Sequence, residues 1–170
     1  FDGMQLRQMI PALLDLDGPV YLRYDRAVAP CFYGDDYRYQ LGRADILRKG
    51  SDVTLISSGI MLTQCLEAAQ ILKENGIEAR VLNMHTIKPI DQEAIIQAAR
   101  ETRGIITVEN HNIIGGLGSA VAEVLAENYP APMRRIGIRD RFGEVGNRAY
   151  LRQCLGIDTG DIVKAAMEWK

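Results

Sequence analysis

Apolar residues recur along the chain at two spacings that alternate from one segment to the next. Short apolar runs are typical of buried strands, and apolar residues repeated every three to four positions are typical of helices with one buried face. The pattern predicts strand–helix–strand repeats with short connections, which favour a largely parallel sheet with helices on both faces. We therefore predict an α/β fold built as a three-layer sandwich. The predicted elements are helix 4–14, strands 20–24, 44–48 and 53–57, helix 62–74, strand 79–84, helix 92–100, strand 104–109, helix 119–128, strand 135–138 and a last helix ending near 169.

Polar residues and turns mark several boundaries of these elements. Asp91 is placed to cap the helix that follows it, and Asp158 with Asp161 three residues later has the spacing of a helix cap. Pro11 lies inside the first helix, where it removes a hydrogen bond and costs about 3 kcal/mol, so we expect a kink or a later start there. The turn at 49–52 between two short strands predicts a hairpin, and hence one antiparallel strand pair.

The regular pattern fails between residues 27 and 43. Five of the seven tyrosines lie between positions 21 and 39, and aromatic residues at this density indicate an ordered connector packed against a neighbour. We therefore divide the chain into residues 1–26, a connector at 27–43, and a domain at 44–170. The helix and strand of residues 1–26 have no sheet of their own. We expect them to be the tail of a preceding unit.

Composition excludes several classes of protein. The 170 residues carry a net charge of −2 and are 47% hydrophobic and 25% charged, values that exclude disordered, collagen-like and coiled-coil proteins. The mild acidity argues against a nucleic-acid partner, and the sequence offers no apolar run of the ~20 residues that would indicate a membrane span. The isolated residues Cys31, Cys65 and Cys154 form no zinc-ligand set, so we expect a reduced, cytoplasmic location. Because the chain begins with Phe1 rather than Met, we expect a piece of a longer protein.

A glycine-rich turn is the first candidate site. Gly115, Gly116 and Gly118 lie between a strand that ends at Glu109 and a helix, an arrangement in which unpaired N–H groups can bind an anion. The dinucleotide fingerprint Gly-x-Gly-x-x-Gly is not met, because its third glycine position is Val121. Two interpretations stay open: an anion or interface site, or a tight turn that lets the helix pack closely on the sheet. The weakness of the pattern favours the second.

Two histidines and two arginines follow predicted strands. His111 and His85 occupy loops of the kind that carry functional groups in open parallel sheets, but spacing identifies no catalytic partner for either, so a structural or interface role is favoured. Arg23 and Arg26 flank Asp25 at a strand end, where two guanidiniums could hold a phosphate. The alternative is an ordinary surface ion pair. We predict no catalytic residue, cofactor-binding residue or metal ligand within the chain.

Three blocks of sequence together resemble the transketolases. They are Gly-Pro-Val-Tyr-Leu-Arg-Tyr at 18–24, Asn-Met-His-Thr-Ile-Lys-Pro-Ile-Asp at 83–91, and Thr-Val-Glu-Asn-His-Asn-Ile-Ile-Gly-Gly-Leu-Gly-Ser-Ala-Val at 107–121. Residues 137–143 and 161–163 fit the same family, so the resemblance covers essentially the whole chain. It is strongest to the C-terminal chain of split, bacterial-type enzymes. It implies that residues 44–170 are the family's C-terminal domain, with a five-stranded, mostly parallel sheet and one antiparallel edge strand. Residues 1–26 would then end the pyrimidine-binding domain.

The resemblance also implies a function for the parent enzyme. Transketolases are dimers that transfer a two-carbon ketol unit between sugar phosphates of the pentose phosphate pathway, using thiamine diphosphate and Mg²⁺. The family's Gly-Asp-Gly motif for the metal and diphosphate is absent from this sequence. The resemblance therefore implies that this chain needs an N-terminal part or subunit, binds no cofactor alone, and serves structure and homodimer formation. An arginine near Arg23 and Arg26 holds the sugar phosphate in the family, and Pro11 and Asp25 depart from its pattern.

Other parent proteins stay open. The same domain occurs in 1-deoxy-D-xylulose-5-phosphate synthase and in the β chain of 2-oxoacid dehydrogenases. A nucleotide-binding regulatory module or a purely structural module would be a different class of function.

Overall fold

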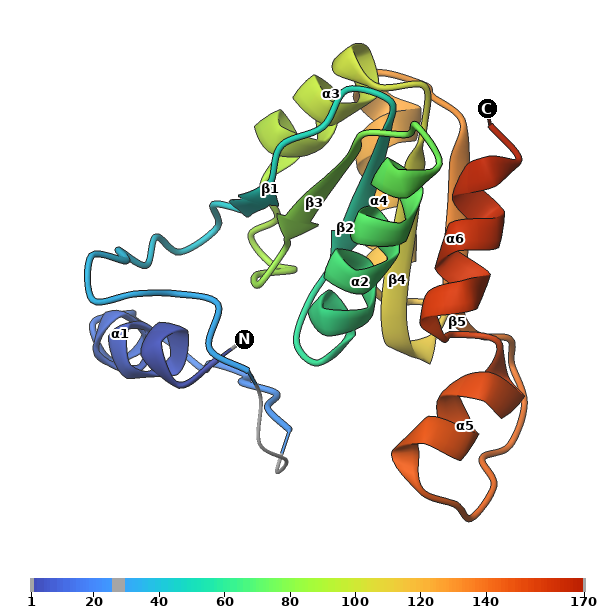
Figure 1. Ribbon diagram of the computed structural model, residues 1–170. Helices are drawn as coiled ribbons and strands as arrows, with labels where there is room; N and C mark the ends of the chain where they lie inside the picture. The colour runs from blue at the N-terminus through green and yellow to red at the C-terminus, as the bar shows by residue number, and fades with distance from the viewer. Residues whose placement is uncertain (1, 26–29, 170) are drawn as a thin grey trace.

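The structure is a computed structural model that describes residues 2–25 and 30–169. Among these residues, none of the helices is long and apolar enough to cross a membrane. The elements in chain order are α1 (Gly3–Leu14), β1 (Asp45–Arg48), β2 (Val53–Ser57), α2 (Met61–Glu74), β3 (Ala79–Asn83), α3 (Gln92–Glu101), β4 (Ile105–Asn112), α4 (Leu117–Asn128), β5 (Met133–Ile138), α5 (Arg148–Leu155) and α6 (Thr159–Met167) (Figure 1).

The strands form a five-stranded sheet in the order β1-β3-β2-β4-β5. Neighbours among β2, β3, β4 and β5 are parallel, whereas β1 runs antiparallel to β3 at one edge. This confirms the predicted fold class, including its single antiparallel edge strand. The predicted hairpin between residues 44–48 and 53–57 is wrong, because β1 pairs with β3 and not with β2.

The turn between β1 and β2 explains this pairing. The backbone N–H groups of Ser51 and Asp52 both donate to the carbonyl of Glu78, just before β3 begins, at 3.0 Å each. A Cβ on Gly50 would lie 2.3 Å from the carbonyl carbon of Ala79. The chain therefore crosses closely over the start of β3, so that β1 and β2 lie on either side of it.

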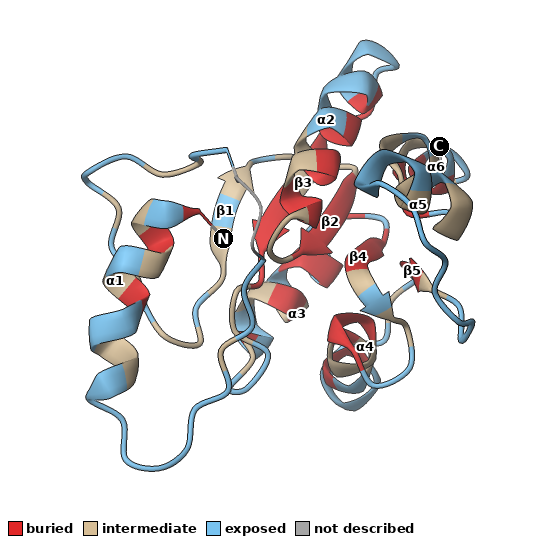
Figure 2. Cartoon of the chain, turned by 90° about the horizontal axis from the view of Figure 1, so that it is seen from below, coloured by how far each residue is buried: buried red, intermediate tan, exposed pale blue. Residues whose placement is uncertain are grey.

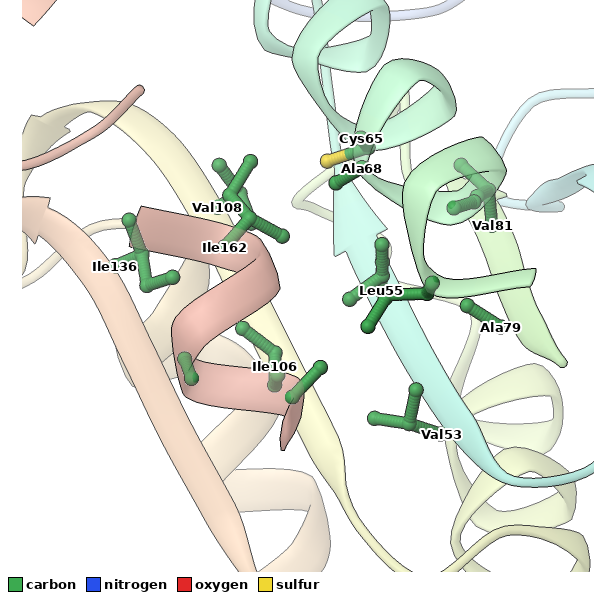
Figure 3. Close-up of a cluster of buried hydrophobic side chains, with 14 of the residues drawn as sticks. Val53, Leu55, Cys65, Ala68, Ala79, Val81, Ile106, Val108, Ile136 and Ile162 are labelled. Carbon is green, nitrogen blue, oxygen red and sulfur yellow. The ribbon is translucent and has the colours of Figure 1, made fainter. Parts of the chain in front are cut away.

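Side chains of the central strands alternate between two buried clusters. On β2, Val53 and Leu55 belong to the cluster covered by α2 and α6, whereas Ile56 belongs to the cluster covered by α3 and α4. Figure 3 shows Leu55, Ile106 and other side chains of the first cluster between the sheet and the helices. Figure 2 shows buried residues concentrated on β2, β3 and the helix faces turned toward them. The predicted three layers are thus confirmed.

Local capping signals set most helix boundaries. The side chain of Asp91 accepts a hydrogen bond from the N–H of Ala94, and Asp158 and Asp161 form a reciprocal capping box at the start of α6. Helix α1 contains Pro11 but begins at Gly3, because the Asp2 side chain caps it, so the expectation of a later start is wrong.

Two segments differ from the sequence-based expectation. Residues 20–24 form neither strand nor helix, and the side chain of Tyr21 is 89% exposed. A strand needs a neighbouring strand for its backbone hydrogen bonds, and the sheet β1–β5 does not extend to this segment. Helix α5 was not predicted at all. None of its eight residues is buried, and so short a segment offers few apolar positions from which a helical period can be recognised.

Candidate functional site

Segments from both ends of the chain meet at the carboxyl ends of the parallel strands. The parallel strands β2, β3, β4 and β5 all end there, at Ser57, Asn83, Asn112 and Ile138. Figure 1 shows α1 outside the sandwich, beyond the ends of β1 and β3. Loops at the carboxyl ends of parallel strands are the usual position for functional groups in such folds. We therefore take the carboxyl ends of these strands as the candidate site.

The buried carboxylate of Glu109 occupies the start of α4. Its side chain is 5% exposed, and its two oxygens accept hydrogen bonds from the N–H groups of Leu117 at 2.9 Å and Gly118 at 2.8 Å. A Cβ on Gly116 would lie 1.9 Å from a Glu109 oxygen, so only glycine allows this approach. The N–H of Gly115 donates to the hydroxyl of Ser119. The donors that an external anion would use therefore already bind groups of this chain, which favours the close-packing interpretation of the glycine turn.

The end of β4 beyond Glu109 is tied to its neighbours. The side chain of Asn112 accepts from the N–H of Ile114 at 2.9 Å and donates to the carboxylate of Asp140 at 3.3 Å. His111 lies next to Asn112 and is exposed. Its exposure leaves the imidazole accessible to a partner chain, and its interface role stays a prediction.

Arg23 contacts the end of β4 at Asn110, a residue 87 positions further along the chain. Its Nη2 donates to the backbone carbonyl of Asn110 at 3.3 Å. Two residues further, Asp25 forms an ion pair with Arg148 at the start of α5. Arg26, the other predicted phosphate-binding arginine, lies outside the described residues. The structure therefore brings Arg23 and Glu109 to the same end of β4, although their sequence motifs are far apart.

A network of polar side chains around Asp45 was missed by the sequence analysis. One carboxylate oxygen of Asp45 accepts hydrogen bonds from the hydroxyl of Tyr33 at 2.6 Å, the hydroxyl of Tyr37 at 2.9 Å and the amide of Gln5 at 3.0 Å. Asn83, at the end of β3, donates to the Tyr33 hydroxyl at 2.7 Å. Burial is the largest cause that raises the pKa of both tyrosines well above the usual value, so they donate as neutral phenols.

A second carboxylate holds the connector at the same place. Asp2 accepts from the backbone N–H of Phe32 at 2.6 Å and of Tyr33 at 3.0 Å, in addition to capping α1. These contacts confirm that the tyrosine-rich connector packs against a neighbour. The density of tyrosines was the one sequence signal of the network. It did not identify the acceptors, because Asp2 and Asp45 lie outside the tyrosine-rich segment.

His85 is buried beside this network. Its side chain is 1% exposed, its Nδ1 lies 2.8 Å from the hydroxyl of Thr86, and its Nε2 lies 3.8 Å from the nearer Asp45 oxygen. Nε2 has no hydrogen-bond partner among the described residues. Burial lowers the pKa of His85, although the nearby Asp45 charge opposes this effect. Burial therefore favours the neutral imidazole, which lies beside the network without a hydrogen bond from Nε2 to any described residue.

Comparison with known proteins identifies the family. A model of the family described as "Transketolase, C-terminal domain" matches residues 42–162, which is more than half of the chain. The chain belongs to the transketolase family. This confirms the resemblance inferred from the sequence blocks.

Two of the relatives are named as transketolase subunits. The chain is 48% identical over 167 residues to the 6-deoxy-6-sulfo-D-fructose transketolase subunit SqwH of Clostridium sp. (strain MSTE9), covering 98% of this chain and 52% of that protein. It is 44% identical over 169 residues to a subunit of the apulose-4-phosphate transketolase of Phocaeicola vulgatus, covering 99% of this chain and 54% of that subunit. The chain thus spans about half the length of these relatives.

A solved structure of a split transketolase has the same fold. The structure described as "Split gene transketolase, inactive beta4 tetramer" superposes with a TM-score of 0.94 at 42% sequence identity, covering 99% of this chain and 55% of that one. The agreement includes the N-terminal segment, because nearly the whole chain is covered.

Membership of the transketolase family implies that the whole enzyme depends on thiamine diphosphate. The described part of this chain offers no ligand set for the metal that accompanies the coenzyme. Among residues 2–25 and 30–169, no group of three or more His, Cys, Asp or Glu side chains is arranged to hold a metal ion. The buried Asn83 oxygen and His85 Nε2 lack hydrogen-bond partners among the described residues, and both residues lie beside the Asp45 network. We therefore assign no coenzyme contact to this chain.

Proposed function

We propose that this chain is the C-terminal part of a cytoplasmic transketolase that transfers a two-carbon ketol unit between anionic sugars. The observation that carries the proposal is coverage: 98% of the chain aligns to one half of a split transketolase subunit at 48% identity. In this proposal the chain supplies structure, subunit contact and one substrate contact. Another part of the enzyme binds thiamine diphosphate and Mg²⁺, and the coenzyme supplies the carbon chemistry.

Either Arg23 or Arg26 is the residue of this chain that we propose touches substrate, and Arg26 lies outside the described residues. A guanidinium can bind two oxygens of a phosphate or sulfonate at once. One relative is named for a sulfo sugar and another for a sugar phosphate, and both of these sugars carry an anionic group. We therefore propose an anionic ketose as substrate class and no particular pathway. The bond from Arg23 to the Asn110 carbonyl supports such a role for Arg23, because Asn110 lies near the end of β4, and the ends of parallel strands commonly carry functional groups.

The proposed partners are an N-terminal transketolase subunit and a second copy of this chain. The split transketolase of known structure is described as an inactive tetramer of its β chain, which supports both self-association and inactivity of this part alone. The N-terminal segment also exposes Leu14, at 79%, and Tyr21, at 89%. Apolar side chains this exposed suit burial against further protein.

Reconstitution tests the proposal. The holoenzyme is assembled from the whole subunit that contains this chain and from the N-terminal subunit, with thiamine diphosphate and Mg²⁺, and ketol transfer from xylulose 5-phosphate to ribose 5-phosphate is measured. Transfer by the mixture and none by either component supports the proposal. Turnover by this chain alone contradicts it. Condensation of pyruvate in place of ketol transfer assigns the chain to the deoxyxylulose-phosphate synthases, and calorimetric binding of NAD or AMP assigns it to the nucleotide-binding class.

A further inference from the structure

His85 lies where α1 and the connector meet the end of the sheet. Its side chain is 1% exposed, and the ring of Tyr39 in the connector lies against the imidazole, with the two ring centroids 4.9 Å apart. The backbone N–H of Tyr39 in turn donates to the side chain of Gln8 on α1 at 2.9 Å. The connector, held to α1, is thus part of the cover that keeps the imidazole from water.

Nε2 of His85 lies near the oxygen that attaches α1 and the connector to the domain. It is 3.8 Å from Oδ2 of Asp45, and the same Oδ2 accepts hydrogen bonds from Tyr33 and Tyr37 of the connector and from Gln5 of α1. A carboxylate oxygen has about two lone pairs, so three donors already occupy its acceptor positions. A proton on Nε2 could bond to this oxygen only by displacing a donor that belongs to α1 or to the connector.

The other ring nitrogen does not have this difficulty. Nδ1 lies 2.8 Å from the hydroxyl of Thr86, which also accepts from the N–H of Gly42 in the connector at 3.4 Å. A hydroxyl can donate or accept, so Nδ1 has a suitable partner in the neutral ring and in the charged ring. The charged ring carries an N–H on both nitrogens, and among the described residues Nε2 has no hydrogen-bond partner. The conflict that protonation creates is therefore at Nε2, beside Asp45.

The charges around His85 act in opposite directions. Burial is the largest influence and lowers the pKa of His85, whereas Asp45 on β1, the backbone of Arg43 and Asp91 at the start of α3 raise it, and the charge of the amino terminus lowers it. Since the net direction is downward, a conformation in which the imidazole meets water gains population as the pH falls below the ordinary value of 6.5. The neighbours from α1 and the connector around Asp45 and His85 are uncharged side chains, namely Gln5, Tyr33, Tyr37 and Tyr39.

We infer that His85 is a pH-sensitive switch in the attachment of α1 and the connector to the sheet: the neutral imidazole leaves them docked, and the protonated imidazole releases them. Release follows whether the charged ring displaces a donor from Asp45 or moves into water, because both changes break contacts with α1 or the connector. The inference goes beyond the proposed function and does not depend on it, since it concerns contacts within this chain.

Amide hydrogen exchange in the whole subunit that contains this chain tests the switch. Exchange is followed by mass spectrometry at about pH 7.5 and about pH 5.5, and each peptide's protection factor, corrected for the intrinsic exchange rate, reports how often that peptide opens. One proton that binds to a ring of ordinary pKa 6.5 can raise the open population by up to about tenfold between these two pH values. We expect protection of residues 3–14 and 30–43 to fall by up to about tenfold at the lower pH. Both should open more often than β2 and β4 at either pH.

Two variants connect the effect to His85. His85→Gln keeps an uncharged side chain at both pH values and should abolish the fall in protection of α1 and the connector. Because the measured quantity is the change between two pH values, a variant that is less protected throughout still answers the question. His111→Gln is the matched control, because His111 is exposed on β4, and it should keep the fall seen in the wild type.

Three outcomes would overturn the switch. The first is equal protection of α1 and the connector at both pH values, or a fall that His85→Gln retains. The second is higher protection at the lower pH, which would show that the charged ring pairs with Asp45 and holds the segment more firmly. The third is that α1 and the connector open no more often than β2 and β4, since protonation would then accompany unfolding of the whole domain.

Discussion

Glu109→Gln tests whether the buried carboxylate holds the start of α4. Glutamine keeps the size of the side chain, but one carboxylate oxygen becomes an NH₂ group that faces a backbone N–H. The two bonds to Leu117 and Gly118, at 2.9 and 2.8 Å, are both made to a charged acceptor. Loss of one such bond removes about 1.5–3 kcal/mol, and loss of the negative charge at a helix start removes about 0.3–1 kcal/mol more. We expect the variant to lose about 3 kcal/mol of its free energy of unfolding.

Urea unfolding followed by circular dichroism measures this loss. With a denaturant dependence of roughly 2 kcal/mol per molar, the midpoint should fall by about 1.5 M. Glu123→Gln is the matched control, because Glu123 is exposed on the same helix, and it should change the free energy of unfolding by less than about 0.5 kcal/mol. A Glu109→Gln variant that unfolds at the wild-type midpoint would show that the carboxylate does not stabilise α4.

Three further results are expected from particular residues. Gly116→Ala should destabilise the protein by about 2 kcal/mol or more in the same urea assay, since its Cβ would lie 1.9 Å from a Glu109 oxygen, whereas Gly160→Ala, with nothing within 4 Å, should change stability by at most about 1 kcal/mol. Burial lowers the pKa of His85 below its usual 6.5, so near that pH the unfolded chain binds more protons than the folded chain. The free energy of unfolding should therefore be unaffected by His85 above about pH 6.5 and should decrease as the pH falls below that value. A His85→Gln variant measured by urea unfolding across this range should show a weaker dependence of the free energy of unfolding on pH. Burial raises the pKa of Cys65 to about 12, so in native protein Ellman's reagent should label the exposed Cys31 and reach Cys65 only after unfolding; rapid labelling of native Cys65 would contradict its buried position.

Elements with a strong local pattern were predicted with nearly their observed bounds. The predicted strand 53–57 matches β2, and the predicted helix 92–100 differs from α3 by one residue. An apolar period and a capping aspartate both act on backbone only a few residues away, so these signals can be recognised in the local sequence. Helix α5 shows the opposite case. Its eight residues are too few for an apolar period to be recognised, although Leu155 is partly buried against the core.

The candidate site was predicted in part. The sequence placed Glu109 at the end of a strand, the glycine turn after it, and Arg23 near the end of the predicted strand 20–24, which does not form. In the structure, Arg23 and the glycine turn both contact residues near the end of β4. The sequence did not show that Glu109 itself occupies the anion-binding position. The sequence also did not reveal the Asp45 network, because its members are far apart in the chain. Gln5, for example, donates to Asp45, which lies 40 positions later.

The amino-acid sequence by itself determined the kind and order of most elements and the α/β class, and its resemblance to a known family implied one antiparallel edge strand. Only the tertiary structure decided that β1 pairs with β3, that residues 20–24 form no strand, and that Asp25 meets Arg148. The physical reason is the range of the interactions. Helix periods and caps depend on residues a few positions apart, whereas strand pairing and ion pairs depend on which distant segments the packed core brings into contact.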